Sequence, residues 1–305
     1  MSDSALHALY HIAEATYGTT PATPSFSRLR NTGCSLATTK QTFVSEELTG
    51  DRMIPNVRHG QKQVGGEIQF ELSDGSFDDL LEAVLGGTWA TNVLKAGTAR
   101  KSFSMLRHFA DLQSGDKPYH LFTGCELNTL NLTIPTGGII TGSFGVIGKS
   151  QTPGTTAPAG AVLGSAGTTE PFDSFTGTLK EGGVTSAIAT EITLTLENAL
   201  EPRFAIGDDE VISQATIGRS NLSGQATFFF ENATLLEKFL NETESSLEID
   251  LTDSAANTLE LLIPALKYNG GNTDTAGGGE ILIPCPFQAF YDETVGSNFR
   301  ITRSA

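Results

Sequence analysis

Polar and apolar residues alternate along several short stretches of the chain. The clearest is residues 67–72, where Glu67, Gln69 and Glu71 alternate with apolar side chains. A period of two residues predicts a β-strand with one buried face and one polar face. Residues 46–66, just before it, are polar, charged and aperiodic, and they are too many for an ordinary turn. The pattern therefore predicts a strand that follows an unusually long loop.

The same pattern occurs again in the second half of the chain. Residues 51–70 align with residues 209–228 without a gap, at an offset of 158 positions. The residues that are identical at this offset are Asp51 and Asp209, Ile54 and Ile212, Gly60 and Gly218, Gly66 and Gly224, and Phe70 and Phe228. Each half then continues into a short helical pattern and returns to strands. We interpret this order as an internal duplication.

These patterns predict a mainly β protein made of two similar units. We place the first unit at residues 1–150, with its long loop at about 43–65, and the second at residues 172–305, with its long loop at about 200–223. Residues 151–171 are rich in Gly, Thr, Ala and Pro, which predicts a linker or exposed loop. Each unit should contain one short helix, capped by Ser76 in the first and by Asn232 or Thr234 in the second.

Charge narrows the range of partners. The chain has 35 acidic and 19 basic residues, for a formal net charge of −16. Such a surface repels phosphates, so we expect no adhesion to DNA, RNA or anionic membranes. The three cysteines, Cys34, Cys125 and Cys285, are far apart, which suits a reducing compartment. Because we find neither a signal peptide nor an apolar run of ~20 residues, we expect a soluble protein made in the cytosol.

No catalytic, metal or cofactor site is recognisable in the sequence. His7 and His11 have the i, i+4 spacing of a helical metal pair, but no further ligand completes it, and we interpret them as a solvated helix face. Residues 142–150 resemble a phosphate-binding loop, but they lead into a Gly/Pro-rich loop instead of a helix. We therefore expect no enzymatic activity, no cofactor and no bound metal.

Two stretches carry a resemblance to a known family. Residues 45–89 read SEELTGDRMIPNVRHGQKQVGGEIQFELSDGSFDDLLEAVLGGTW. Together with residues 101–150, they resemble the tail tube (major tail) proteins of long-tailed, non-contractile bacteriophages. The order GDR, RHG, GG, F and D.LLEA is the most specific part, and residues 196–230 resemble the family more loosely.

The resemblance implies a tail-tube fold, a β-sandwich or half-barrel with a short flanking helix and a long inter-strand loop. Subunits of this family join their sheets into rings, and the rings stack into the virion's tail tube. Ring closure satisfies every sheet edge, and open head-to-tail stacking gives a filament. Such rings are commonly sixfold. We therefore expect a homotrimeric, pseudo-sixfold ring of two-unit chains, with a homohexamer as the alternative.

The resemblance also implies partners. These are the tape-measure, tail terminator and initiator or distal tail proteins, with double-stranded DNA passing through the lumen without specific binding. Three other functions stay open: a tube-forming protein of a phage-related secretion system, a β-sandwich surface or adhesin protein, and an enzyme with a divergent site. The repeat argues against the first, the missing signal peptide against the second, and the missing cluster of titratable residues against the third.

Candidate lumen residues lie on the polar faces of the predicted strands. Carboxylates and small polar groups repel phosphates, whereas Lys or Arg would bind them. The candidates are Glu67, Gln69, Glu71, Gln225, Thr227, Thr193, Thr195 and Glu197. The alternative is the solvated face of an ordinary antiparallel sheet. Phe229, next on the same face, fits poorly in a polar lumen.

Basic residues stand out in the first long loop of this acidic chain. We predict that they meet acidic surface of the next ring, with apolar neighbours adding contact area. The candidate stacking residues are Arg52, Ile54, Val57, Arg58, His59 and Lys62. The alternative is that the charges are simply solvated.

Overall fold

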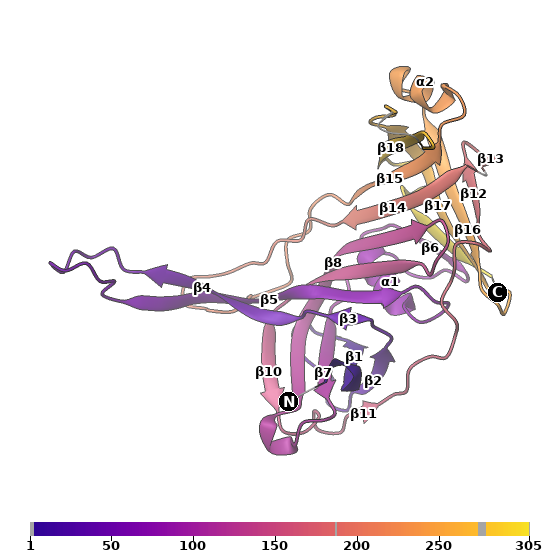
Figure 1. Ribbon diagram of the computed structural model, residues 1–305. Helices are drawn as coiled ribbons and strands as arrows, with labels where there is room; N and C mark the ends of the chain where they lie inside the picture. Colours follow the sequence, from indigo (N-terminus) through magenta and orange to yellow (C-terminus); the bar gives the residue numbers. More distant parts are fainter. Residues whose placement is uncertain (1–2, 187, 274–278, 305) are drawn as a thin grey trace.

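The computed structural model describes residues 3–186, 188–273 and 279–304, and these residues form a mainly β structure with two α-helices (Figure 1). The first half contains β1 (His7–Ala13), β2 (Ser25–Leu29), β3 (Gly33–Cys34), β4 (Ala37–Val44), β5 (Val57–Glu71), α1 (Asp78–Leu85), β6 (Val93–Lys95), β7 (Phe103–Phe109), β8 (Tyr119–Pro135), β9 (Thr141–Gly148), β10 (Ser150–Gly154) and β11 (Val162–Leu163). The second half contains β12 (Thr178–Glu181), β13 (Val184–Thr185), β14 (Ala189–Glu197), β15 (Asn221–Phe229), α2 (Thr234–Leu240), β16 (Ser245–Thr252), β17 (Thr258–Tyr268), β18 (Leu282–Ala289) and β19 (Arg300–Arg303). Short 3-10 helices occur at Ser4–Leu6 and Ser114–Asp116.

The two halves have the same strand order. In the first half the antiparallel order is β4–β5–β9–β8–β7–β1–β2. In the second half it is β14–β15–β18–β17–β16–β12–β13, again antiparallel. α1 follows β5 along the chain, and α2 follows β15. Strand by strand, β4, β5, β9, β8, β7, β1 and β2 of the first half therefore correspond to β14, β15, β18, β17, β16, β12 and β13 of the second half, because each also has the same place along its half of the chain.

The pairing register of the two halves also coincides. Cys34 pairs with Ile68, and the residues 158 positions later, Ile192 and Ala226, pair with each other. A register shift of one residue would turn every side chain of a strand to the opposite face. The hairpin of β3, β4 and β5 and the hairpin of β14 and β15 therefore bury equivalent faces.

β8 joins the two halves into one sheet. The N-terminal part of this 17-residue strand pairs with β7 and β10, and the C-terminal part pairs with β9 and β14. Residues 129–135 of β8 are antiparallel to residues 191–197 of β14. Figure 1 shows β8 and β14 side by side in the middle of the molecule. The sheet thus continues from β4 and β5 into the second half without a break.

An apolar core runs under this sheet. Phe70, Phe77 and Phe144 pack together, with the ring centroids of Phe70 and Phe144 4.5 Å apart. α1 buries most of its apolar side chains, whereas α2 buries none. Gly86 ends α1 in the left-handed region (φ 64°), where a residue with a Cβ would be strained.

The long loop expected at residues 43–65 is mostly a β-hairpin. β4 pairs with β5 from Ala37 and Gly65 to Val44 and Val57, so only residues 45–56 lack strand structure. We call this hairpin, residues 37–65, the arm, and it projects far from the rest of the molecule (Figure 1). Most of its residues are exposed on both faces, so the sequence has no alternation of buried and polar positions there. The prediction of a loop was therefore wrong for residues 43–44 and 57–65.

The second long loop is irregular over residues 198–220, apart from an isolated bridge between Glu201 and Thr216, and β15 begins at Asn221. Residues 151–171, expected as a linker, include most of β10 and all of β11. These two strands pair with β8 and β2 of the first half.

Three local expectations differ from the structure or are refined by it. His7 and His11 lie on β1 instead of a helix, because pairing with β2 and β7 overrides their helical spacing. The N-cap of α1 is Phe77, and the Ser76 hydroxyl donates to the carbonyl oxygen of Asp74 instead of capping the helix. The N-cap of α2 is Ala233 instead of Asn232 or Thr234, although Asn232 Oδ1 accepts a hydrogen bond of 2.9 Å from the backbone N–H of Thr234.

Candidate functional site

The strands around β8 present a polar face opposite the core. On β5, Glu67 and Gln69 are exposed and Glu71 is half-buried, whereas the alternate residues Ile68 and Phe70 are buried. On β14 and β15 the residues of the polar face are Thr193, Thr195, Glu197, Gln225 and Thr227, all exposed or half-buried. The candidate lumen residues thus lie on alternating positions opposite the core.

Strand pairing aligns these residues in rows across five strands, in the order β5, β9, β8, β14 and β15. One row consists of Glu71, Thr141, Thr133, Thr193 and Gln225. The next consists of Gln69, Ser143, Asn131, Thr195 and Ser223. A third consists of Glu67, Gly145, Thr129, Glu197 and Asn221. The structure therefore brings the candidates from both halves onto one continuous surface, the polar face.

Hydrogen bonds link the middle row across the junction of the two halves. Asn131 Nδ2 donates to Ser143 Oγ over 3.1 Å, and Thr195 Oγ1 donates to Asn131 Oδ1 over 3.0 Å. Asn131 and Ser143 were not among the sequence-based candidates. The signal was present, because polar and buried residues alternate through the second half of β8 and through β9.

The polar face carries acidic but no basic side chains. The three rows contain the carboxylates of Glu67, Glu71 and Glu197, and Glu191, the partner of Thr227, adds a fourth on the same face. The three rows, all within described residues, contain no Lys or Arg. Phe229 is half-buried at the end of β15 and is the one aromatic residue that continues the Gln225 and Thr227 positions. A surface of this kind offers hydroxyl, amide and carboxylate groups and repels phosphate.

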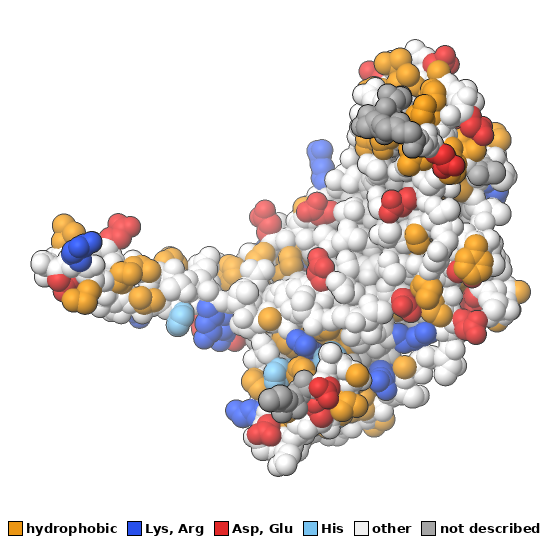
Figure 2. Space-filling model, in the orientation of Figure 1, with side chains coloured by type: hydrophobic (Ala, Val, Ile, Leu, Met, Phe, Trp, Pro, Cys, Tyr) orange, Lys and Arg blue, Asp and Glu red, His pale blue; other side chains and the backbone are white. Residues whose placement is uncertain are grey.

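The arm carries most of the candidate stacking residues. Arg52, Ile54, Val57, Arg58 and His59 are all exposed, with 64% of Ile54 and 52% of Val57 accessible. Further exposed apolar residues on the arm are Phe43, Val44, Leu48 and Met53. Figure 2 shows apolar and charged side chains mixed along the arm and at its tip. Such exposed apolar side chains on a projection are typical of a surface that another protein covers.

Lys62 differs from the other candidates because it is paired within the chain. Its Nζ lies 2.9 Å from Glu210 Oε1 and 3.3 Å from Asp209 Oδ2, both in the second long loop. Its backbone N–H also donates to the carbonyl oxygen of Asp209 over 2.8 Å. The hydrogen bond to Glu210 raises the pKa of Lys62. The second loop is thus fastened along the base of the arm.

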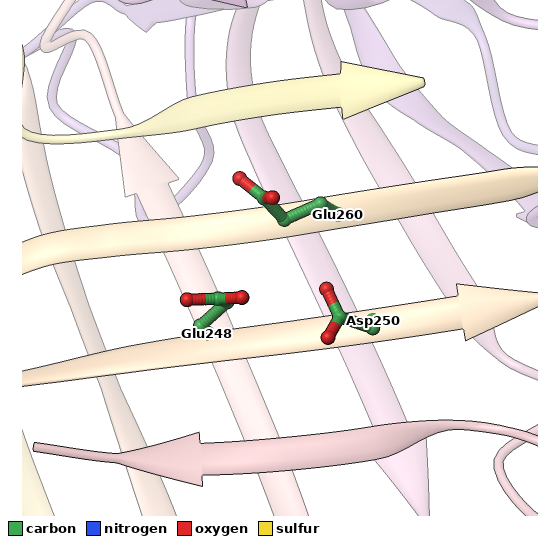
Figure 3. Close-up of side chains that lie close together, drawn as sticks. All are labelled: Glu248, Asp250 and Glu260. Carbon is green, nitrogen blue, oxygen red and sulfur yellow. The ribbon is translucent and has the colours of Figure 1, made fainter. Parts of the chain in front are cut away.

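Three carboxylates lie together elsewhere, on β16 and β17. The side chains of Glu248 and Asp250 on one strand and Glu260 on the next project from the same side of the sheet (Figure 3). Lys180 Nζ forms ion pairs with Glu248 and with Asp250, and Arg300 Nη2 lies 2.6 Å from Glu260 Oε1. Each of the three carboxylates therefore has Lys180 or Arg300 as an ion-pair partner, and the cluster is an ion-pair network on the sheet surface.

The cysteines are free thiols. Burial raises the pKa of Cys34 and Cys125, and it raises the pKa of Cys285 to about 11. A raised pKa keeps a thiol neutral and unreactive near pH 7. These side chains therefore act as small apolar groups in and beside the core.

Comparison with known proteins decides the family. The profile of a family described as phage tail tube protein matches residues 4–289 of the chain, which includes both halves and the arm. The chain belongs to the phage tail tube protein family. A search of curated proteins finds no match.

Membership confirms the resemblance found in the sequence and the expectation of a mainly β structural protein of the virion. A tail tube protein assembles with copies of itself. Neither helix in the described residues of this tail tube protein is long and apolar enough to span a membrane.

Proposed function

We propose that copies of this tail tube protein form rings whose polar face lines the channel for DNA ejection into the host. The observation that carries the proposal is the set of aligned rows, which cross both halves of the chain with acidic and neutral polar groups and without a basic residue. Phosphate groups would be repelled from such a wall, so DNA would pass through it without binding.

We further propose that three chains complete a ring. Both halves have the same strand order and register, which supports an internal duplication, and β8 and β14 join them in line within one sheet. Three chains would then supply six similar units and close a pseudo-sixfold ring with no free edge.

The arm is assigned to contacts between stacked rings. The arm offers exposed apolar side chains and the basic residues Arg52, Arg58 and His59, while the chain has a net negative charge. Opposite charges across such a contact would select the register of one ring on the next. Lys62, paired with the second loop, would stiffen the base of the arm. The tape-measure, terminator and initiator proteins are the proposed partners at the tube interior and ends.

Electron microscopy of the purified protein at increasing concentration tests this function, combined with native mass measurement of the particles. We expect sixfold-looking rings with the mass of three chains, and tubes of stacked rings at higher concentration. Rings with the mass of six chains would replace the trimer by the hexamer. Particles that remain single chains at every concentration and salt would contradict unassisted ring formation.

A further inference from the structure

The strand pairing of the arm is interrupted at one position. The register of β4 and β5 shifts by one residue between Lys40 and Thr42. Between the two flanking pairs, β4 has one residue, Gln41, and β5 has two, Gly60 and Gln61. Two residues opposite one form a β-bulge, which leaves the extra residue unpaired and bends the strand that carries it. The arm therefore has a bend that is built into its strands.

The bulge divides the arm into two parts with different surroundings. We call residues 37–40 and 62–65 the base, and residues 42–59 the outer part. The two strands of the outer part pair only with each other, and no hydrogen bond or ion pair joins this part to another described part of the chain. It projects into solvent (Figure 1). Beyond the bulge, the direction of the arm thus has no support from the rest of the molecule.

The base, in contrast, is held from both sides. Val64 is buried and pairs with Thr38 of β4 and with Gly148 of β9. Thr38 Oγ1 also donates to Gln151 Oε1 of β10 over 2.7 Å. At the last pair before the bulge, Lys62 binds the second loop through its backbone N–H and its Nζ. The base therefore keeps a fixed direction relative to the sheet.

One side chain of the outer part lies over the bulge. A Cβ atom added to Gly60 would clash with Cε2 of Phe43, so the Phe43 ring lies directly against the Gly60 backbone. The same side chain is 58% exposed. Dispersion contacts of a largely exposed ring are weak and non-directional. The Phe43 ring therefore favours one direction of the outer part without fixing it.

We propose that the bulge is a hinge, at which the outer part of the arm changes direction relative to the base. The ladder of β4 and β5 is already interrupted at Gln41, Gly60 and Gln61, so bending there breaks no regular strand pair. Paired residues on either side keep each part rigid, and the outer part moves as one body. The use of this movement rests on the proposed stacking of rings: the tip can turn toward the surface that it contacts, and the contact then selects one direction.

Distances between spin labels measure the hinge in the full-length chain. In a Cys34→Ser background, where the other two cysteines are buried, one label is placed at Ser114→Cys in the second 3-10 helix. The second label is placed on β4, either beyond the bulge at Val44→Cys or before it at Thr39→Cys, and all three labelled sites are exposed. Labelled chains are diluted with unlabelled chains, so that pulsed electron paramagnetic resonance detects distances within one chain only.

The two label pairs should differ in the width of their distance distributions. With Val44 the distribution should be at least about twice as wide as with Thr39, because a bend at the bulge moves every residue beyond it. Movement of the reference site at Ser114 would widen both distributions, so the comparison removes it. Equal widths for the two pairs would overturn the hinge.

Two variants assign the movement to the bulge. Deletion of Gln61 removes the extra residue and gives β4 and β5 one continuous register, so the Val44 distribution should narrow to the width found with Thr39. Phe43→Ala removes the ring that lies against Gly60 and should widen the Val44 distribution; because this ring is largely exposed, the variant should fold. A Val44 distribution that changes in neither variant would overturn the assignment to the bulge.

Assembled tubes separate the hinge from the proposed stacking. In stacked rings the Val44 distribution should narrow, because contact of the tip with the next ring selects one direction. Tubes in which it stays as wide as in the single chain would overturn the use of the hinge in stacking. A wild-type protein that forms no tubes, but has the wide distribution in the single chain, would overturn the proposed stacking and support the hinge.

Discussion

Arg107 shows how one side chain can serve two parts of the molecule. Its Nε donates to His7 Nε2 over 3.0 Å, and its Nη1 donates to the carbonyl oxygen of Leu36 between β3 and β4. The first contact requires His7 to be neutral at Nε2, because a protonated ring has no lone pair to accept a hydrogen bond. Burial, the charge of Arg107 and the nearby His108 together lower the pKa of His7 from 6.5 to about 4, and burial contributes most.

This pKa predicts a loss of stability in mild acid. The unfolded chain binds the proton of His7 below pH 6.5, whereas the folded chain resists it until about pH 4, so the free energy of unfolding falls over this range. Replacing His7 by Gln should remove that part of the fall. Between pH 7 and 5.5 the wild type should lose more than the variant, by less than about 1.4 kcal/mol because His7 is only half-buried. Urea unfolding at both pH values measures the difference, and equal losses would contradict the assignment.

At the scale of elements, the arm is held by backbone hydrogen bonds and ion pairs instead of by an apolar core. β4 and β5 satisfy each other's backbone groups over most of its length, and the second loop adds the contacts of Lys62 with Asp209 and Glu210. An isolated two-stranded hairpin is marginal in water. Continuity of β5 with the buried part of the sheet, together with the second loop, therefore holds the arm in place.

The arm tip should be needed for stacking and not for folding. Replacing residues 45–56 by Asn-Gly would join Val44 to Val57 through a two-residue turn. Because side chains such as Leu48 (99% accessible) and Met53 (73%) are exposed, we expect the free energy of unfolding to change by no more than about 0.5 kcal/mol. Rings should still form, but tubes should not. A variant with a Gly/Ser tip of the original length separates the effect of the side chains from that of reach, and long tubes from both variants would contradict the assignment.

At the scale of the whole molecule, the proposed contacts depend on where the charged residues lie and not on the net charge alone. The formal net charge is −16, yet Arg52 and Arg58 lie on the arm and Arg28, Arg30 and Arg107 line one cleft, whereas the three rows of the polar face contain no Lys or Arg. DNA would meet acidic and neutral groups on the polar face. A neighbouring ring would meet charges of both signs on the arm, because Glu46, Glu47 and Asp51 are exposed there beside Arg52 and Arg58.

Charge reversal on the polar face tests this distribution in assembled phage. Glu67→Lys together with Glu71→Lys should leave the tubes unchanged, because Glu67 is exposed and Glu71 half-buried on the sheet surface. Genome delivery, measured as infectious particles per intact virion, should fall by at least about tenfold as phosphates bind the new ammonium groups. Glu244→Lys with Glu293→Lys, at exposed sites on other surfaces, is the matched control. Equal delivery by both variants would place the polar face outside the channel.

Much of the fold could be predicted from local patterns, and the errors occur where those patterns are missing. Glu67, Gln69 and Glu71 alternate with buried residues, so their strand was recognisable; residues 57–65 belong to the same strand but were taken for a loop because nothing buries one face of the arm. Likewise, His7 and His11 have a helical spacing, and only pairing with β2 and β7 makes their segment a strand.

The sequence alone determined the family, the mainly β class and the acidic character, because each follows from residue types and from their short and regular spacings. Only the tertiary structure decided that β8 joins β14, that Glu71 and Thr193 share a row, and that residues 57–65 extend β5 into the arm. Strand pairing joins residues far apart in the chain, and its register depends on the packing of the whole sheet. A local pattern specifies which face of a strand is buried, whereas the neighbour of that strand is selected only when the sheet assembles.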